Sequence, residues 1–466
     1  MRVVMKFGGT SVGNGDRILN VARLVYGYAT QGHAIVVASS AMSGVTDTLI
    51  KSARRAAEGD ANTFVTAHDS LTQQHFAVLE RAVSDESMRA ILSQQIQERL
   101  AEFANLCRSI HILGELTPRA LDMVGSLGER LLVPILAQAL RENGAQAQAI
   151  ESTELVVTDD NFTQASPLMD ATRQKSRALL MPILQAGGIP VVTGFIGATR
   201  QGIITTLGRG GSDYTGTILG NAIDADEVWI WTDVNGVMTA DPRIVPNAQT
   251  IPEISYGEAA ELSYFGAKVI HPKTISPAAE RDIPIRILNT FEPTHPGTRI
   301  VRAPKTNGHT AKAITAIRGL GLVTVEGRGM QGVPGVAGRV FATVAREGIS
   351  VLMISQSSSE QNICFIIEAN AVERALSALD HEFELDRMRG NIDRVWAQEH
   401  IVIVAIVGAG MKGTPGIAAN VFGALGDKNL NVISIAQGSS EFNLSLVVDE
   451  HDANGAMRAI HDRFNL

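Results

Sequence analysis

An internal repeat in the C-terminal third limits what this part of the chain can fold into. Gly327–Gly335 matches Gly408–Gly416, and residues 325–362 and 406–443 are identical at 16 of 38 positions. Two copies are too few for a solenoid. Each copy reads as strand, glycine-rich loop, helix, strand, turn, strand and helix. This order predicts two small α+β domains of the split βαβ (ferredoxin-like) type.

Both copies also fit the G-x-G-x-x-G pattern of dinucleotide-binding proteins, as in Gly408–Gly413. That pattern indicates NAD only in a full βαβ unit with an acid after the next strand. Here the next expected strand, Asn431–Ala436, is followed by Gln437 and Gly438. We therefore interpret the glycines as turns. An NAD-dependent enzyme remains an alternative that predicts binding of a nicotinamide cofactor.

The first 300 residues alternate short β-rich runs with helical patterns, and residues 60–143 are almost wholly helical in composition. Such alternation predicts a three-layer αβα domain with a mostly parallel sheet. The expected strands are Arg2–Phe7, Ala34–Ala38, Pro190–Phe195 and Glu227–Thr232, and the expected helices include Asp16–Tyr28 and Ser212–Ala225. A Pro- and Gly-rich stretch at 293–312 marks a linker. The expected parts are a first domain at 1–300, a linker at 301–317, and repeat domains at 318–398 and 399–466.

Composition excludes several classes of protein. Two cysteines provide neither a disulfide framework nor a metal cluster, and the histidines lack zinc-site spacing, so we expect no protein-built metal site. A net charge of −8 without a long Lys/Arg run argues against nucleic acid. The longest apolar stretch, Ile401–Met411, is about half of the ~20 residues that cross a membrane. The chain starts directly in an expected strand, without a signal-type apolar region. We expect a cytoplasmic protein.

Two glycine-rich corners suggest a site for an anion. Lys6–Ser11 leaves a strand and precedes a helix, so its backbone N–H groups and the lysine can approach a phosphate; the alternative is a surface turn. Leu207–Thr215 places Arg209 among glycines just before a helix, which suits a carboxylate or phosphate. Within it, Ser212 and Asp213 can alternatively be helix N-caps.

Two further segments carry weaker signals. Trp231–Arg243 ends a strand in Thr-Asp and turns at Asn-Gly, and ligands of open α/β sheets lie beyond the carboxyl ends of strands. An ordinary turn is the competing interpretation. Phe265–Pro272 places Lys268 in an apolar segment, where either a phosphate or a structural carboxylate can explain it.

Together these segments resemble the amino-acid kinase family, and within it the aspartate kinases. Further matching segments are Ser39–Thr46, Gly128–Arg130 and Asp241–Arg243, and the order of all segments fits along the whole chain. The repeats resemble the paired ACT domains that follow the kinase domain in this family. The resemblance implies transfer of phosphate from ATP to L-aspartate, with Mg²⁺ bound mainly through the nucleotide phosphates. The acceptor is already ionised at neutral pH, which fits a site rich in Lys, Arg and Gly and poor in His.

The resemblance also implies residue roles. Lys6 contacts the transferring phosphoryl group, with Gly8 and Gly9 as N–H donors, and Asp213 orients the lysines or the metal. Arg209 holds a substrate carboxylate and Glu129 pairs with the substrate ammonium, although Glu129 alone also fits a solvated helix charge. Ser40, Thr46, Phe195 and Ser212 line the substrate pocket. The nucleotide residues are Thr232, Asp233, Met238, Arg243, Lys268 and Val269. Met238 departs from several relatives, which carry Tyr there.

For the repeats, the resemblance is greatest to the threonine-sensitive branch. It implies feedback control, with Gln356 and Gln437 as effector ligands; interface positions on edge strands are the alternative. Threonine is the first candidate and lysine the second. A homodimer or larger assembly through the ACT domains is implied, and the residues 463–466 are expected to return to the first of them. No dehydrogenase domain follows Leu466, so we expect a monofunctional chain or a fragment. Alternatives are a sister kinase for another carboxylate, carbamate or UMP, and a catalytically silent amino-acid sensor.

Overall fold

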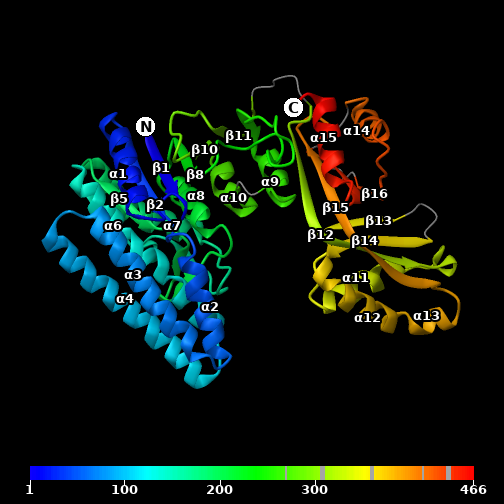
Figure 1. Ribbon diagram of the computed structural model, residues 1–466, viewed down its shortest axis with the longest axis horizontal. Coiled ribbons are helices and arrows are strands. Elements are labelled where there is room, and N and C mark those ends of the chain that lie inside the picture. Colours follow the sequence, from blue (N-terminus) through cyan, green and yellow to red (C-terminus); the bar gives the residue numbers. More distant parts are fainter. Residues whose placement is uncertain (268–269, 305–309, 357–360, 412–413, 437–441) are drawn as a thin grey trace. The chain divides into compact units, whose positions relative to one another are not determined.

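The computed structural model describes residues 1–466 except 268–269, 305–309, 357–360, 412–413 and 437–441. The chain forms two compact units (Figure 1). The first comprises Met1–Val237, Thr250–Ala260 and Val269–Lys305, and the second Met238–Gln249, Glu261–Lys268 and Thr306–Leu466. Each unit has its own sheet and its own core.

The sheet of the first unit is mostly parallel, as predicted. Its strand order is β3-β5-β2-β1-β8-β10-β11-β9, and among these pairings only β10 with β11 is antiparallel. The strands are β1 (Arg2–Phe7), β2 (Ala34–Ser39), β3 (Ala147–Ile150), β5 (Ile189–Thr193), β8 (Glu227–Thr232), β9 (Glu253–Ser255), β10 (Ile285–Asn289) and β11 (Thr298–Val301). A small second sheet contains β4 (Val157–Thr158), β6 (Ile196–Thr199) and β7 (Ile204–Thr206).

Helices cover both faces of the large sheet, because side chains alternate along each strand. From β1, Met5 and Phe7 join a core shared with Val21 of α1, whereas Lys6 packs against Gly216 of α8 on the other face. The helices are α1 (Gly15–Thr30), α2 (Val45–Ala57), α7 (Met169–Gln185), α8 (Gly211–Ile223), α9 (Tyr256–Tyr264), whose last residues belong to the second unit, and α10 (Pro272–Glu280). The three-layer prediction is confirmed.

The predicted helical stretch at 60–143 is confirmed. It contains α3 (Ala61–Ala82), α4 (Glu86–Leu113), α5 (Pro118–Gly125) and α6 (Leu127–Glu142), and the long helices α3 and α4 run side by side (Figure 1). Asp60 and Asp85 cap the first turns of α3 and α4 with side-chain hydrogen bonds. Gly114 ends α4 in the left-handed conformation.

The second unit contains one antiparallel sheet in the order β13-β14-β12-β15-β17-β16. Its elements are β12 (Ala313–Glu326), α11 (Val336–Arg346), β13 (Met353–Gln356), β14 (Asn362–Glu368), α12 (Val372–Glu382), α13 (Glu384–Met388), β15 (Arg394–Val407), α14 (Ile417–Gly426), β16 (Ser434–Ala436), β17 (Asn443–Asp449) and α15 (Ala453–Phe464), with the short helices η2 (Arg328–Met330) and η3 (Ala369–Ala371). The described strand pairs of this sheet are all antiparallel, whereas a dinucleotide-binding βαβ unit has parallel strands.

The strands β12 and β15 each contribute to the cores of both repeats. β12 and β15 are long and pair along their lengths (Figure 1). Ile314 at the start of β12 packs with Val404 in the core of the second repeat, whereas Val323 near its end packs with Val395 in the core of the first. The predicted linker at 301–317 is therefore wrong in part, since it includes the first residues of β12.

The end of the chain differs from the expectation as well. Arg463 and Phe464 end helix α15, and Phe464 and Leu466 pack against the core of the second repeat. They do not form the expected strand that returns to the first repeat. No helix among the described residues is long and apolar enough to cross a membrane.

Candidate active site

Lys6 and Asp213 form a close ion pair where β1 and α8 meet. The distance from Lys6 Nζ to Asp213 Oδ1 is 2.5 Å, and Lys6 is 6% exposed. The Lys6 stem lies against Gly216, where an added Cβ would be 3.2 Å from Lys6 Cβ. A buried ammonium needs a counter-charge, and Asp213 supplies it.

The glycine corner after β1 brings two backbones together. A Cβ added to Gly9 would lie 2.9 Å from the carbonyl oxygen of Ala41 and 3.1 Å from the amide nitrogen of Ser43, so this approach requires glycine. The Gly8 N–H donates to the Trp231 carbonyl at 3.2 Å. It is therefore not free to donate to a phosphate in this structure, contrary to the role expected for it.

The loop before α8 presents an arginine. Gly210 is the N-cap of α8 in the left-handed conformation, and Ser212 and Asp213 lie inside the helix. The alternative that these two side chains are N-caps is therefore wrong. Arg209 is exposed, and no hydrogen bond or ion pair joins its guanidinium to the residues that the structure describes. It is available for a ligand.

Glu129 is a buried carboxylate at the start of α6. Gly128 lets this helix approach the segment after β2, since a Cβ there would be 2.8 Å from the Ala41 Cβ. Glu129 is 2% exposed, and Ser212 Oγ donates to its Oε1 at 3.5 Å. Burial raises the pKa of Glu129 to about 8, against a backbone hydrogen bond from Ala41 and the charge of Lys6, which lower it. Its Oε2 has no hydrogen-bond partner among the described residues, so it can accept from a cationic ligand.

Asp122 is a second buried carboxylate, which sequence reasoning missed. Thr206 donates to it from Oγ1 at 2.6 Å and from the backbone at 3.0 Å, and the Thr163 N–H donates at 2.9 Å. Burial raises the pKa of Asp122, and these hydrogen bonds oppose the shift. Both its oxygens are occupied, so Asp122 holds the end of β7 rather than a ligand. The sequence contains no sign of this role except that Asp122 lies in α5, the helix just before the one that carries Glu129.

These side chains line one cavity of about 530 Å³ within the first unit. The predicted residues found there are Lys6, Ser40, Thr46, Glu129, Phe195, Arg209, Ser212 and Asp213. Lining residues that were not predicted include Asp47, Arg54, Asp122 and Thr163. Phe195 follows β5 instead of ending it, and its φ of 69° is unusual for a residue with a side chain. Its N–H donates to Thr215 Oγ1 at 3.0 Å, which helps hold that conformation.

The predicted nucleotide residues are divided between the two units. Thr232 ends β8 and Asp233 follows it in the first unit, whereas Met238 and Arg243 belong to the second. Arg243 pairs with Asp241 at 2.6 Å. Lys268 and Val269 lie outside the described residues. Their nucleotide roles remain predictions.

Gln356, at the end of β13, lines a separate cavity of about 260 Å³ in the second unit. Gly335, Val336 and Ala337 from the start of α11 line its other side. Gln437 lies outside the described residues.

Comparison with known proteins places the chain in a family. The model of the amino acid kinase family matches residues 1–289, and an ACT domain model matches residues 323–383 and 404–464. The chain therefore belongs to the amino acid kinase family and carries two ACT domains. Its relatives within the family are aspartokinases. It is 33% identical over 467 residues to the chloroplastic aspartokinase 2 of Arabidopsis thaliana, covering 99% of this chain and 84% of that one.

Bifunctional enzymes are similar as well. The chain is 37% identical over 468 residues to the chloroplastic bifunctional aspartokinase/homoserine dehydrogenase 1 of Zea mays, covering 99% of this chain and 50% of that one. It thus spans about half the length of the bifunctional relatives that it matches. Among solved structures, E. coli aspartokinase III with aspartate and ADP (R-state) gives a TM-score of 0.82 at 31% identity over 100% of both chains. The same enzyme with lysine and aspartate (T-state) gives 0.81 at 32% identity over 99% of each.

Proposed function

We propose that this chain transfers the γ-phosphoryl group of ATP to the side-chain carboxylate of L-aspartate, giving ADP and 4-phospho-L-aspartate. The observation that carries the proposal is the convergence of Lys6, Arg209 and Glu129 on one cavity. Lys6 supplies a positive charge for a phosphoryl group, Arg209 supplies one for a carboxylate, and Glu129 supplies a carboxylate that ionises as it binds an ammonium. The aspartate and ADP bound by E. coli aspartokinase III support the same assignment.

Arg209 and Glu129 hold the amino-acid acceptor. Arg209 has no competing partner among the described residues and its planar guanidinium suits a carboxylate. Glu129 faces the substrate ammonium with its free Oε2. Ser40, Thr46, Phe195 and Ser212 shape the rest of the pocket. These contacts require an α-amino acid with a second carboxylate, which favours aspartate over carbamate or UMP.

The transfer itself needs positioning and charge neutralisation. One carboxylate oxygen of aspartate forms a bond to the γ-phosphorus as the bond from that phosphorus to the bridging oxygen breaks, and ADP leaves with the electron pair. The acceptor is ionised at neutral pH, so no general base is needed. Lys6 neutralises the equatorial oxygens, and Asp213 keeps the ammonium aimed at them.

Among the described residues, the cavity offers a Mg²⁺ ion only one carboxylate beside the expected phosphates, that of Asp213. Oδ1 of this carboxylate is paired with Lys6, so Oδ2 is the hard oxygen that remains for the ion. When bound, the ion supplies neutralisation of the phosphate charge. We propose that the nucleotide would carry it and that Asp213 would be the protein residue to hold it. Thr232, Asp233, Met238, Arg243, Lys268 and Val269 are proposed to bind the nucleotide.

We further propose feedback control by an amino acid at the ACT domains, with threonine as the first candidate and lysine as the second. Gln356 offers both a donor and an acceptor. It lines a cavity of about 260 Å³ beside the first turn of α11, whose free N–H groups suit a carboxylate. Gln437 is proposed as the corresponding residue of the other repeat. The lysine complex of E. coli aspartokinase III supports an amino-acid effector of this kind.

A homodimer or larger assembly through the ACT domains is also proposed. β13 and β16 form the two edges of the sheet, and Ile354 and Ile435 on them are exposed. Light scattering after size exclusion measures the assembly directly. A reducing, cytoplasmic environment remains our prediction, and both cysteines are free in the structure.

The test is ADP release from Mg-ATP with L-aspartate, compared with L-glutamate, acetylglutamate, carbamate and UMP. Hydroxylamine in a parallel reaction traps an acyl phosphate as a hydroxamate and so identifies the acceptor group. Aspartate-dependent release with hydroxamate formation supports the proposal. Release with another acceptor identifies a sister kinase, and no release with any acceptor identifies a silent sensor. Adding millimolar threonine or lysine tests the effector.

A further inference from the structure

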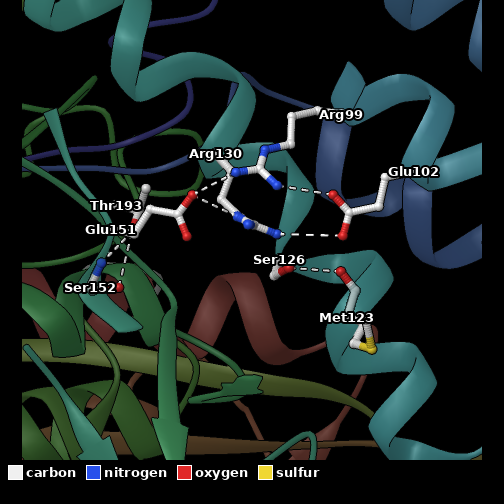
Figure 2. A network of polar contacts seen from close by, with 8 residues as sticks. All are labelled: Arg99, Glu102, Met123, Ser126, Arg130, Glu151, Ser152 and Thr193. Carbon is white, nitrogen blue, oxygen red and sulfur yellow. Dashed lines mark hydrogen bonds and ion pairs between the residues drawn. The ribbon is translucent and has the colours of Figure 1, made fainter. Parts of the chain in front are cut away.

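A polar network lies beside the start of α6, the helix that carries Glu129. Arg99 and Arg130 converge on Glu102 and Glu151 (Figure 2). Arg130 Nε donates to Glu151 Oε1 at 3.0 Å, and Arg99 reaches the same oxygen at 3.0 Å. These residues line a second cavity of about 550 Å³ in the first unit. The role proposed for the substrate pocket does not use them.

We propose that the Arg130–Glu151 ion pair positions Glu129 for recognition of the substrate ammonium, and that Arg130 is thereby a specificity-determining positioning residue. The inference rests on the proposed function. Arg130 follows Glu129 in the first turn of α6, and consecutive helical side chains point about 100° apart. Glu129 therefore faces the substrate cavity while Arg130 faces the second cavity.

Anchoring Arg130 fixes the rotation of α6 about its own axis. A carboxylate about 6 Å from a helix axis, roughly half of a helix diameter, moves about 1 Å when the helix rotates by about 10°. A displacement of this size weakens the contact between Glu129 and the substrate ammonium equally in the bound substrate and in the transition state, so it raises the KM for aspartate and leaves kcat nearly unchanged. The Arg130 side chain is only 9% exposed, in contrast to the 35% of Arg99, so its ion pair is more shielded from solvent than an ordinary surface pair.

The other end of the ion pair reaches a second wall of the substrate pocket. Ser152, next to Glu151, donates from its backbone to Thr193 Oγ1 at 2.8 Å and from its hydroxyl to the Ile196 carbonyl at 2.7 Å. Figure 2 shows the contact with Thr193. Thr193 and Ile196 flank the turn that carries Phe195. One ion pair therefore links the helix of Glu129 to the turn of Phe195.

The test compares two matched variants of the full chain, Arg130→Met and Arg99→Met. Each removes one arginine from Glu151 and leaves the other in place, so neither leaves that carboxylate without a cation. For Arg130→Met we expect the KM for aspartate to rise about tenfold or more, with kcat and the KM for ATP within about twofold. Arg99→Met should change all three constants by less than about twofold. Arg130→Lys, which keeps the charge, should fall between wild type and Arg130→Met.

Inhibition by succinate distinguishes a displaced Glu129 from a loosened substrate pocket, because succinate has both carboxylates of aspartate and no ammonium. In Arg130→Met its inhibition constant should stay at the wild-type value while the KM for aspartate rises. A parallel rise of both constants, or equal effects of Arg130→Met and Arg99→Met, would overturn the inference. If Arg130→Met does not fold, Glu151→Gln provides the same comparison, with a smaller expected rise in the KM for aspartate. Absence of aspartate-dependent turnover in the wild-type chain would instead reject the proposed function, and this inference with it.

Discussion

Lys6 Nζ and Asp213 Oδ1 lie 2.5 Å apart, although one residue lies near the end of the first strand and the other in the first turn of a helix far along the chain. The pair places a nearly buried positive charge at the cavity where a phosphoryl group is proposed to transfer. Asp213 supplies the counter-charge of this lysine and holds its ammonium group in one position. The proposed chemistry therefore depends on a contact that unites the two glycine-rich corners.

Lys6→Ala should lower kcat by about 100-fold or more, because it removes a charge that acts on the transferring group. Binding of aspartate, measured by calorimetry, should change little because Arg209 and Glu129 remain. Lys51→Ala, an exposed lysine on α2, is the control and should behave as wild type. Normal turnover of Lys6→Ala in the ADP-release assay would remove Lys6 from the mechanism.

Binding of aspartate should depend on pH through the ionisation of Glu129. Its carboxyl has a pKa of about 8 through burial, so below that pH it holds a proton in the free protein. Binding an ammonium requires the carboxylate, so aspartate binding near pH 7 should release a proton. Calorimetry in two buffers of different ionisation enthalpy measures that proton. Glu129→Gln should abolish the release and raise the KM for aspartate. Proton release that persists in Glu129→Gln would assign it to another group.

The same carboxyl affects stability with a definite sign. Its pKa is higher in the folded chain than the ordinary value of 4.5 that it has when unfolded, so the folded state binds more protons between about pH 4.5 and 8. Its contribution to stability is complete below that window and is lost as pH rises through it. Thermal melts should show a shallower fall with pH in Glu129→Gln than in wild type. Identical slopes would mean that Glu129 ionises normally.

Asp122→Asn should destabilise the fold. Oδ1 accepts from a hydroxyl and Oδ2 from two backbone N–H groups, so the amide nitrogen of Asn would either face those N–H groups or replace the charge-assisted bond from Thr206 Oγ1 by a weaker bond to a neutral amide. We expect a loss of about 1–3 kcal/mol in the free energy of unfolding, measured with denaturant. Asp69→Asn on the exposed face of α3 should change it by less than about 0.5 kcal/mol. Equal stability of the two variants would show that the Asp122 contacts are weak.

Gln356→Ala should relieve inhibition by threonine without changing uninhibited turnover, because Gln356 lines the small cavity of the second unit and not the substrate cavity. Inhibition curves over millimolar threonine provide the measurement. Gln361→Ala is the matched control, since Gln361 is exposed and does not line that cavity. Unchanged inhibition of Gln356→Ala would move the effector site elsewhere.

The sequence by itself determined the class of the fold and the character of the site. Strands such as β1 and the helices between 60 and 143 follow from apolar periodicity and helix propensity, which are local properties of the chain. The glycine corners at Lys6–Ser11 and Leu207–Thr215 were visible because close backbone approach requires that residue. The internal repeat likewise predicted two related small domains, and the ACT matches agree with it.

Tertiary structure alone decided which of these pieces act together. Three contacts join residues that are distant in sequence: the ion pair of Lys6 with Asp213, the hydrogen bonds from Thr206 to Asp122, and the ion pair of Arg130 with Glu151. The start of β12 joins the second repeat by pairing with the end of β15, and this pairing made the predicted linker wrong from Ala313 onward. The physical reason is that burial, ion pairing and strand register are set by non-local neighbours, whereas sequence patterns report the backbone preferences of short segments.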